Sequence, residues 1–381
     1  MERRNISADI TRYGKNKMKT AIIHYWLINM RGGEKMLEAL LDIFPDADIF
    51  THVYNPKAIS NLINSKRIIT SSINRLPFAK KMYQAYMPLM PKALLEFNLQ
   101  KYDLVISSEA GPAKGIVPNP NAYHICYCHS PMRYLWDMFH DYQKNASLLV
   151  RYFMKMFTLS LRNWDISSSN LVDRFITNSN YVAKRILRYY NREADVVFGP
   201  APIEQYLNIE RKPQDYYLFF GQITSYKKVD LALEACNKSG RKLIIAGAGA
   251  DKKLISKYKK NKKIIFKGKV TNEEVSSLFS GARALLYPGI EDLGLIPIEA
   301  NAAGCPVIAF RDGGALDTIK ENVTGIFFNE QTPESLINAM DLFENNFNNV
   351  NREVFNEHVK QFSKEAFIER IKKVINERKR I

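Results

Sequence analysis

Short apolar runs alternate with stretches of helically spaced apolar residues along almost the whole chain. In the first half the apolar runs, which we expect to be β-strands, lie at 20–26, 48–51, 104–107, 122–128 and 175–177. A helix pattern between the first two runs extends from Lys35 to Leu41 and stops at Pro45. Buried strands that alternate with helices are typical of a parallel sheet covered on both faces. The first half is therefore expected to be an α/β domain.

The same alternation restarts after a proline-rich segment without periodicity at 196–213. Here we expect strands at 216–220, 242–246, 264–267, 284–287 and 306–310, and helices at 229–238, 272–279, 297–303 and 363–380. We therefore predict two Rossmann-like domains with doubly wound parallel sheets, which face each other across a cleft that holds the ligand. The predicted parts are an N-terminal extension at 1–17, a first domain at 18–198, a second at 199–362, and a C-terminal helix at 363–381 that packs back on the first domain.

The composition excludes several other classes of protein. Of the 381 residues, 46% are hydrophobic and 25% are charged, which describes a globular chain rather than a disordered or fibrous one. No apolar run reaches the roughly 18 residues of a membrane-spanning helix, and the polar start, 1–19, lacks the apolar segment of a secretory signal. The 4 cysteines are too few for a disulfide framework and favour a reducing compartment, so we expect a cytoplasmic protein.

Three short patterns resemble cofactor motifs, and each has a simpler interpretation. Cys126, Cys128 and His129 form a C-x-C-H cluster, but no second ligand pair has the spacing of a zinc site, so buried thiols in a strand explain it. The D-x-D at 46–48 stands where a helix gives way to a strand. The A-G-A-G at 246–249 lacks the third glycine and the acidic residue of a dinucleotide fingerprint. We predict no metal and no cofactor.

The most informative segment is YPGIEDLGLIPIEANAAGCPVIA at 287–309. It is expected to be a buried strand, a loop with two glycines, and a helix whose first residue is Pro297. Gly289 and Gly294 would let the backbone approach a ligand closely. The backbone N–H groups at this helix start would suit a phosphate.

Two carboxylates, Glu291 and Glu299, lie eight residues apart in this segment, in the loop and in the expected first helical turn. One could reach a sugar and the other a ribose, with phosphates between them. The alternative is an ordinary β-α loop with an acidic residue near the helix start, where a negative charge is favourable.

This segment resembles the signature of the retaining glycosyltransferases of family 4, which have the GT-B fold, and the resemblance covers nearly the whole chain from Met18. The run GQITSYKKVDLALEA at 221–235 is similar to the family's donor-phosphate loop. Lys227 stands at the family's lysine, whereas Gln222 replaces its usual arginine. The resemblance implies that the first domain binds the acceptor and the second binds the nucleotide sugar.

Two longer motifs indicate a subgroup. HYWLINMRGGEKMLEALLDIFPDADIFT at 24–51 and HICYCHSPMRYLWD at 124–137 are similar to the bacterial O-antigen and exopolysaccharide mannosyltransferases. The resemblance implies a hexosyltransferase of polysaccharide or lipopolysaccharide synthesis, which transfers mannose from GDP-mannose to a glycan or polyprenyl-linked glycan. A UDP-sugar donor on the same fold is one alternative. The other is a non-catalytic basic protein that binds membranes or nucleic acid.

The resemblance also implies roles for individual residues. Lys227 would neutralise the leaving nucleoside diphosphate, Glu291 would contact the sugar, and His129 would face the donor sugar; we expect these three to be catalytic. The expected donor-binding residues are Gly32, Gly33, Gln222, Lys227, Val270, Glu291, Gly294, Leu295, Ile296 and Glu299. Gly32 and Gly33 would present backbone N–H groups to the distal phosphate, Glu299 would bind the ribose, and the backbone of Val270 would contact the base. No covalent nucleophile is assigned, because the donor's own phosphate is the expected base.

The formal net charge is +16, and residues 1–200 hold +11 of it, with 27 basic and 16 acidic residues. The segment 74–97 mixes aromatic residues with Arg75, Lys80, Lys81 and Lys92, a pattern that suits an anionic membrane surface. We therefore expect peripheral contact with the inner face of the cytoplasmic membrane; ordinary helix packing with solvated lysines is the alternative. The lysine run at 252–269 has no nucleic-acid fold signature beside it, so a solvated face explains it and no nucleic acid is predicted.

Overall fold

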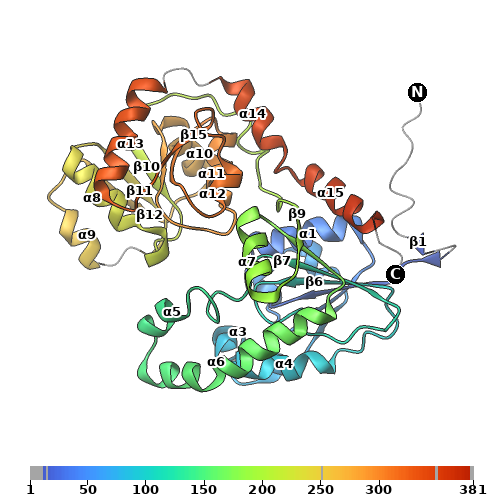
Figure 1. Ribbon diagram of the computed structural model, residues 1–381. Coiled ribbons are helices and arrows are strands. Elements are labelled where there is room, and N and C mark those ends of the chain that lie inside the picture. The colour runs from blue at the N-terminus through green and yellow to red at the C-terminus, as the bar shows by residue number, and fades with distance from the viewer. Residues whose placement is uncertain (1–11, 14–15, 250–251, 348–350, 378–381) are drawn as a thin grey trace, which may run out of the picture. The chain divides into compact units, whose positions relative to one another are not determined.

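The computed structural model describes residues 12–13, 16–249, 252–347 and 351–377. The chain divides into two compact units, one formed by 1–200 together with 367–381 and the other by 201–366. Each unit is built on its own parallel sheet (Figure 1). A two-stranded antiparallel sheet, β1 (Arg12–Tyr13) and β2 (Asn16–Lys17), precedes the first of them.

The first unit has a seven-stranded parallel sheet in the order β5-β4-β3-β6-β7-β8-β9. The predicted strands are present as β3 (Thr20–His24), β4 (Asp48–Thr51), β6 (Leu104–Glu109), β7 (Tyr123–Cys128) and β8 (Arg174–Thr177). The two edge strands of the sheet are β5 (Ile68–Thr70) and β9 (Ala194–Val196), which were not predicted. Both are three residues long and only partly buried, so they carry little of the apolar signal that marks the central strands.

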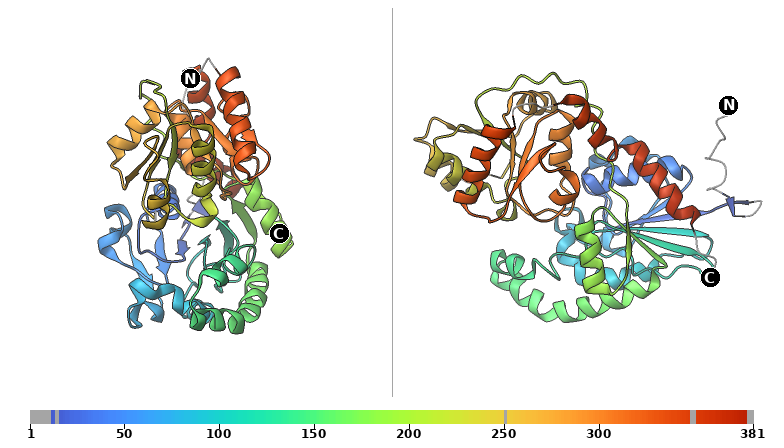
Figure 2. Two further views of the ribbon diagram at one scale, coloured as in Figure 1. Left: turned by 90° about the vertical axis from the view of Figure 1, so that its left-hand side faces the viewer. Right: turned by 45° about the horizontal axis from the view of Figure 1, so that its top comes forward.

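Side-chain alternation along the strands divides the core of the first unit into two layers. Ile22 of β3 joins the cluster under α1 (Gly32–Ile43) and α15 (Lys364–Asn376), whereas Ile23 joins the cluster on the opposite face. That opposite face is covered by α4 (Met90–Ala93), α6 (Leu148–Ser168) and α7 (Asn180–Tyr190) (Figure 2). The remaining short helices of this unit are α2 (Asn61–Asn64), α3 (Ala79–Met82) and α5 (Phe139–Asn145).

The second unit has a six-stranded parallel sheet in the order β12-β11-β10-β13-β14-β15. Its strands are β10 (Tyr217–Phe220), β11 (Leu243–Ala246), β12 (Ile264–Gly268), β13 (Leu285–Tyr287), β14 (Val307–Phe310) and β15 (Gly325–Phe328). All but the last were predicted, and β15 lies at the edge with two partly buried residues. Its helices are α8 (Val229–Ser239), α9 (Lys252–Tyr258), α10 (Asn272–Gly281), α11 (Leu295–Ala302), α12 (Ala315–Thr318), α13 (Pro333–Asn346) and α14 (Arg352–Lys360).

The start of α11 differs from the prediction. The helix begins at Leu295 and not at Pro297, because Gly294 adopts a left-handed conformation with φ of 88° and so provides the N-cap. Pro297 occupies the third helical position, where the missing N–H group costs little because helix starts leave these donors unpaired. Among the described residues, none of the helices is both long and apolar enough to cross a bilayer.

Candidate functional site

The predicted donor-binding residues of the second unit lie in loops that follow the carboxyl ends of its strands. One loop, at 221–228, follows β10, and another, at 288–294, follows β13. The two loops touch at Gly289, where an added Cβ atom would lie 2.7 Å from the Cα atom of Lys227 and 2.7 Å from the carbonyl oxygen of Tyr226. Any larger residue would push the loops apart, so the glycine is required for this approach.

Lys227 and Glu291 form an ion pair where these loops meet. The Lys227 Nζ atom lies 2.7 Å from Glu291 Oε1, and the two side chains are only 10% and 21% exposed. Two opposite charges that are partly withdrawn from water attract each other more strongly than they would in bulk solvent. A phosphate bound here would compete for the lysine and release the carboxylate for hydroxyl groups. Two of the three predicted catalytic residues are thus in direct contact.

The start of α11 lies in the same loop system. Its N-cap, Gly294, has no side chain, so no side-chain cap bonds the first N–H groups of the helix. A Cβ atom on Gly294 would lie 2.9 Å from the hydroxyl oxygen of Tyr287, so this position also requires glycine. Leu295 and Ile296 form the first turn, and backbone N–H groups at such a position suit an anion.

Glu299 lies in the second turn of α11, and not in the first as expected, because the helix begins two residues early. Burial raises the pKa of Glu299 to about 7, although the positive charge of Lys227 acts in the opposite direction. The carboxyl group therefore changes its charge close to neutral pH. Carboxyl groups perturbed in this way are concentrated at functional sites.

The A-G-A-G segment serves loop packing. The N–H of Gly247 donates to the carbonyl oxygen of Gly268 at 2.7 Å, and a Cβ atom on Gly247 would lie 1.8 Å from the carbonyl oxygen of Gly221. These glycines therefore bring the loop after β11 against the loop at 221–228. Of the other predicted donor residues, Gln222 has an exposed side chain, and Val270 is partly exposed just before α10.

Gly32, Gly33 and His129 lie at the carboxyl end of the other sheet, in the first unit. The two glycines are the first residues of α1, directly after the segment that follows β3. A Cβ atom on Gly33 would lie 2.4 Å from the hydroxyl oxygen of Tyr25, so a side chain here would displace the tyrosine. His129 follows β7, and its N–H donates to the carbonyl oxygen of Glu109 at 2.8 Å.

His129 begins a polar chain that the sequence did not reveal. Its Nε2 atom lies 3.0 Å from Ser108 Oγ, which lies 2.9 Å from His24 Nδ1. The other nitrogen of His24, Nε2, lies 3.6 Å from Glu34 Oε1. Glu34 Oε2 in turn accepts a hydrogen bond from the backbone N–H of Arg31 at 2.8 Å. The residues come from three strand ends and the first turn of α1.

The environment of this chain keeps its two ends in different states. Burial lowers the pKa of His129 to about 3, and the nearby His24 adds to the effect, so the His129 ring is neutral at physiological pH. Burial would raise the pKa of Glu34, but hydrogen bonding from the His24 side chain and from the backbone N–H of Arg31 outweighs it and lowers the pKa. A neutral imidazole therefore stands at one end and a carboxylate at the other.

A second buried polar cluster lies beside His129. Lys114 Nζ lies 2.6 Å from Glu109 Oε1 and also contacts Asp165, and all three side chains are fully buried. Asp165 Oδ2 accepts hydrogen bonds from Trp136 Nε1 at 2.7 Å and from the Tyr190 hydroxyl at 2.9 Å. Glu109 provides the carbonyl to which His129 is bonded, so this cluster fixes the backbone at the end of β6 and β7.

The C-x-C-H cluster does not converge. Strand alternation places Cys126 and Cys128 in the core under α7, whereas Tyr127 points to the opposite layer. The ring of His129 packs 5.0 Å from the ring of Tyr127 and bonds to Ser108, away from the thiols. Within the described part of the chain, no group of three or more His, Cys, Asp and Glu residues could hold a metal ion.

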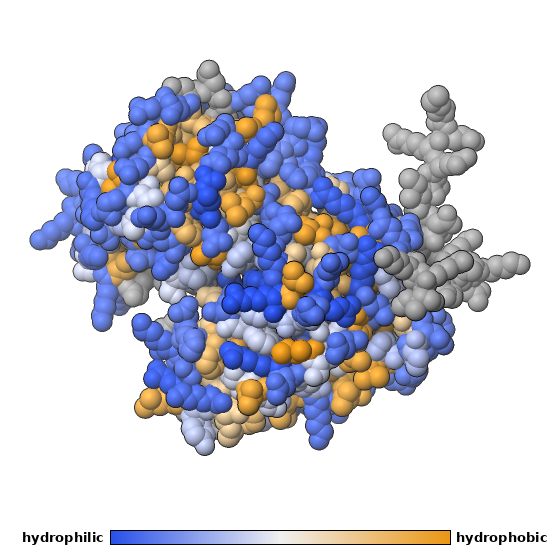
Figure 3. All heavy atoms as spheres, in the orientation of Figure 1, coloured by the Kyte–Doolittle hydropathy of each residue, from blue (hydrophilic) through white to orange (hydrophobic). Residues whose placement is uncertain are grey.

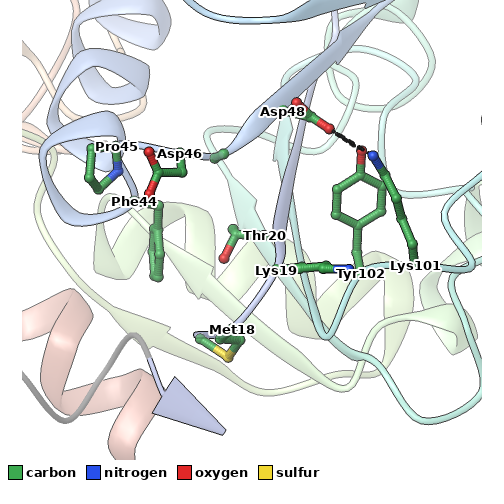
Figure 4. Close-up of a pocket in the computed structure, with 10 residues that line it drawn as sticks. Met18, Lys19, Thr20, Phe44, Pro45, Asp46, Asp48, Lys101 and Tyr102 are labelled. Atoms are coloured by element: carbon green, nitrogen blue, oxygen red, sulfur yellow. Dashed lines mark hydrogen bonds and ion pairs between the residues drawn. The ribbon is translucent and has the colours of Figure 1, made fainter. Parts of the chain in front are cut away.

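The D-x-D segment lies at the amino end of the sheet of the first unit, on the side opposite His129. It borders a pocket of about 360 Å³ that is lined by Met18, Lys19, Thr20, Phe44, Pro45, Asp46, Ala47, Asp48, Lys101 and Tyr102. Asp48 points toward Tyr102 and Lys101, whereas Asp46 lies beside Phe44 and Pro45 (Figure 4). The two carboxylates therefore do not converge on one point as a metal-binding D-x-D would require.

The predicted membrane-facing residues are exposed. Arg75, Lys80, Lys81 and Lys92 all present their side chains to solvent. Large apolar side chains are exposed in the same segment, namely Phe78, Met82, Leu89 and Leu95. Mixed basic and apolar exposure of this kind is typical of surfaces that contact anionic bilayers.

Helix α6 extends this surface with residues that the sequence did not single out. A stripe of exposed apolar side chains follows one side of the helix at intervals of three, four and seven residues: Leu148, Tyr152, Met156, Leu159 and Ile166. On its inner side, Trp164 packs against the cluster that contains Leu94 and Phe97, so α6 and the 74–97 segment cover the same face of the sheet. Over the region of α6, Figure 3 shows apolar and hydrophilic atoms side by side.

Residues 204–362 match the family model described as glycosyl transferases group 1. The chain is also similar to an uncharacterized glycosyltransferase, MJ1607, from Methanocaldococcus jannaschii, with 29% identity over 32% of this chain and 34% of that protein. Alpha-1,3/1,6-mannosyltransferase ALG2 from Mus musculus is 27% identical over 57% of this chain and 58% of its own length. A GDP-mannose-dependent alpha-mannosyltransferase from Corynebacterium glutamicum is 30% identical over 28% of this chain and 26% of its own. This chain thus spans 34% of the length of MJ1607 and 58% of the length of mouse ALG2.

Solved structures show the same architecture. HepE from Anabaena in complex with UDP and glucose matches with a TM-score of 0.66 and 14% identity, over 94% of this chain and 100% of that one. WaaG, a glycosyltransferase involved in lipopolysaccharide biosynthesis, matches with a TM-score of 0.61 and 14% identity over the same shares. The predicted fold class, with two Rossmann-like parallel-sheet domains of the GT-B kind, is confirmed.

Proposed function

We propose that this chain, whose second unit carries the group 1 glycosyltransferase match, is a retaining hexosyltransferase that uses GDP-mannose. The single observation that carries the proposal is the Lys227–Glu291 ion pair beside the uncapped start of α11 and the perturbed Glu299, all at the carboxyl end of one parallel sheet. Mannose and GDP are supported by the distant mannosyltransferase relatives and by the motifs at 24–51 and 124–137. The proposed acceptor is a glycan or a lipid-linked glycan.

Each residue has a chemical task in this proposal. The first N–H groups of α11 and Lys227 bind the diphosphate, and Lys227 neutralises the charge that develops when it leaves. Glu291, once released from Lys227, accepts hydrogen bonds from sugar hydroxyls and stabilises positive charge at the anomeric carbon. Glu299 accepts hydrogen bonds from the ribose. Glu291 is not assigned as a nucleophile; the departing phosphate takes the acceptor proton.

Nucleotides provide the direct test of this site. We expect GDP to raise the unfolding temperature more than UDP or ADP does, since a ligand at 100 times its Kd contributes about 2.7 kcal/mol to stability. The effect should be larger at pH 8 than at pH 6, because Glu299, with its pKa raised to about 7, is ionised only at the higher pH. Thermal shift measured at both pH values checks this expectation.

The variants and outcomes separate the alternatives. Glu299→Gln should remove most of the difference between the two pH values, because the amide does not titrate. If UDP stabilises most, the donor is a UDP-sugar. If no nucleotide stabilises the chain, the donor site does not exist and a non-catalytic binding protein becomes the better interpretation.

We also propose that the first unit binds the surface of an anionic membrane through the 74–97 segment and the exposed stripe of α6. The basic side chains would approach the lipid headgroups while the apolar ones enter the interface, and each basic residue contributes about 1 kcal/mol near such a surface. Peripheral binding of this kind would bring a lipid-linked acceptor to the protein.

Vesicle co-sedimentation tests the membrane proposal. The wild-type chain should sediment with vesicles that contain anionic lipid at low salt and less so at high salt, because salt screens exposed charges. The double variant Lys80→Glu, Lys81→Glu should reduce binding at least tenfold. Lys259→Glu, Lys260→Glu changes two exposed lysines of the second unit by the same charge and should bind like the wild type. Equal loss of vesicle binding in both double variants would show that net charge alone accounts for the binding. It would refute a defined membrane-binding surface.

A further inference from the structure

The polar chain from His129 to Glu34 has a direction that its carboxylate end determines. An ionised carboxylate can only accept hydrogen bonds. A lone pair on His24 Nε2 facing Glu34 Oε1 at 3.6 Å would be repelled, so the stable arrangement has the proton on that nitrogen. In a neutral His24 ring, Nδ1 is then an acceptor, and it takes the hydroxyl proton of Ser108. Ser108 Oγ, having donated, accepts from Nε2 of His129.

We infer that Glu34, acting through His24 and Ser108, holds His129 in the tautomer with its proton on Nε2, so that the lone pair of Nδ1 can accept a hydrogen bond from a sugar hydroxyl group. His24, Ser108 and Glu34 are positioning residues in this scheme, and His129 is the residue that contacts the ligand. Only the identification of the ligand as a sugar rests on the proposed function; the direction of the chain does not.

The surroundings of the chain agree with this direction. Among the described residues, no protein donor bonds His129 Nδ1, and the ring is flanked by Tyr127 at 5.0 Å and by Tyr25 at 6.3 Å between ring centres. Both tyrosines have a raised pKa because of burial, so neither adds a charge next to the ring. A second proton on His24 would reverse the two bonds at Ser108 and turn His129 Nδ1 into a donor.

Another histidine of the first unit, His124, has the opposite tautomer and serves as a reference within the protein. His124 Nδ1 lies 2.6 Å from the carbonyl oxygen of Leu171, which can only accept, so the proton must be on Nδ1. Its Nε2 lies 2.8 Å from Ser107 Oγ and accepts from that hydroxyl. Two neighbouring serines of β6 therefore bond histidines in opposite senses, and only His129 depends on a distant carboxylate.

Nitrogen NMR of the full chain labelled with ¹⁵N-histidine tests the inference without any turnover. Two-bond ¹⁵N–¹H correlation spectra distinguish the two tautomers, and a His129→Asn variant assigns the signal among the 6 histidines. At about pH 8 we expect the Nε2–H tautomer for His129 and the Nδ1–H tautomer for His124. A Nδ1–H tautomer at His129 in the wild-type chain would overturn the inference.

Among the variants, Glu34→Gln should produce the largest change in the tautomer of His129. The amide oxygen would keep the N–H of Arg31, which leaves the amide NH₂ group to donate to His24 Nε2. The whole chain then reverses, and His129 should appear as the Nδ1–H tautomer while His124 stays unchanged. Ser108→Ala, which breaks the chain without altering a charge, should give a mixture of both tautomers, and Ser107→Ala should leave His129 unaffected. An unaltered His129 in both the Glu34→Gln and Ser108→Ala variants would refute the coupling.

Kinetics provide the functional readout. Glu34→Gln should lower kcat for sugar transfer about tenfold, which corresponds to the loss of one hydrogen bond at the sugar, whereas GDP binding, which we place in the second unit, should not change. If transfer is absent even in the wild-type chain but the tautomers are as expected, the proposed function fails and the positioning chain stands. If transfer proceeds but His129 is the Nδ1–H tautomer, the proposed function stands and the positioning chain is refuted.

Discussion

Glu291→Ala is expected to lower sugar transfer about 100- to 1000-fold, on the order of losing a main electrostatic group at a reacting centre, while the chain stays folded. The side chain is partly exposed and pairs with Lys227 where two loops meet, so its removal leaves no cavity in the core. Lys227 would then be free to bind phosphate at all times. GDP should therefore bind as well as in the wild type or more tightly, and the loss should appear in kcat. Transfer rates with GDP-mannose and calorimetric titration of GDP measure the two effects separately.

Two control variants test whether the charge of the Glu291 side chain, rather than its shape, is responsible for the loss. Glu291→Gln keeps the shape but removes the charge, and we expect nearly the same loss of transfer. Glu330→Ala removes an exposed carboxylate elsewhere in the same unit and should retain full activity. Near-normal transfer by Glu291→Ala would show that the carboxylate does not act on the sugar, and weaker GDP binding in that variant would show that Glu291 supports the phosphate site instead.

The second unit was the easier part to predict from the sequence, because the residues that we propose for donor binding belong to continuous segments. Lys227 and Glu291 each lie in a loop that directly follows an apolar strand, and parallel strands bring such loops to one edge. The glycines that allow the contact, such as Gly289, are visible in the sequence as well. The start of α11 was placed two residues late, because Pro297 is a common first residue of helices and the left-handed Gly294 cap is not visible in residue identity.

The first unit shows what residue patterns do not contain. His24 and Glu34 lie in a motif that resembles one subgroup, and Ser108 lies in an apolar strand, yet nothing in their spacing indicates that they meet His129. They come together only because β3, β6 and β7 are neighbours in the sheet, and the order of strands is not written in any local pattern. For the same reason, the sequence did not predict the contact between Lys114 and Asp165, which are 51 positions apart.

Lys114 is the residue whose replacement should cost the fold most. It is fully buried between Glu109 and Asp165, and this contact raises its pKa although burial alone would lower it, so it stays charged. Lys114→Met fits the space but leaves two carboxylates in the core without a cation. Breaking a buried ion pair by removing one partner costs about 3–5 kcal/mol. Urea denaturation should therefore show a loss of this size in the free energy of unfolding.

The pH dependence of this loss identifies its cause. Burial raises the pKa of Glu109, the nearby Asp165 adds to it, and Lys114 opposes it, so removing the lysine should raise that pKa further. A carboxyl group with a raised pKa in the folded state destabilises the fold above its unfolded pKa of about 4.3 and not below it. The deficit of Lys114→Met should thus shrink as the pH falls toward about 5, and adding Glu109→Gln should restore part of the stability at pH 8. A deficit that is independent of pH and unchanged by Glu109→Gln would indicate lost packing rather than unpaired charge. Because the carbonyl of Glu109 holds the backbone of His129, the stability lost here should also reduce the order of the polar chain at the neighbouring strand end.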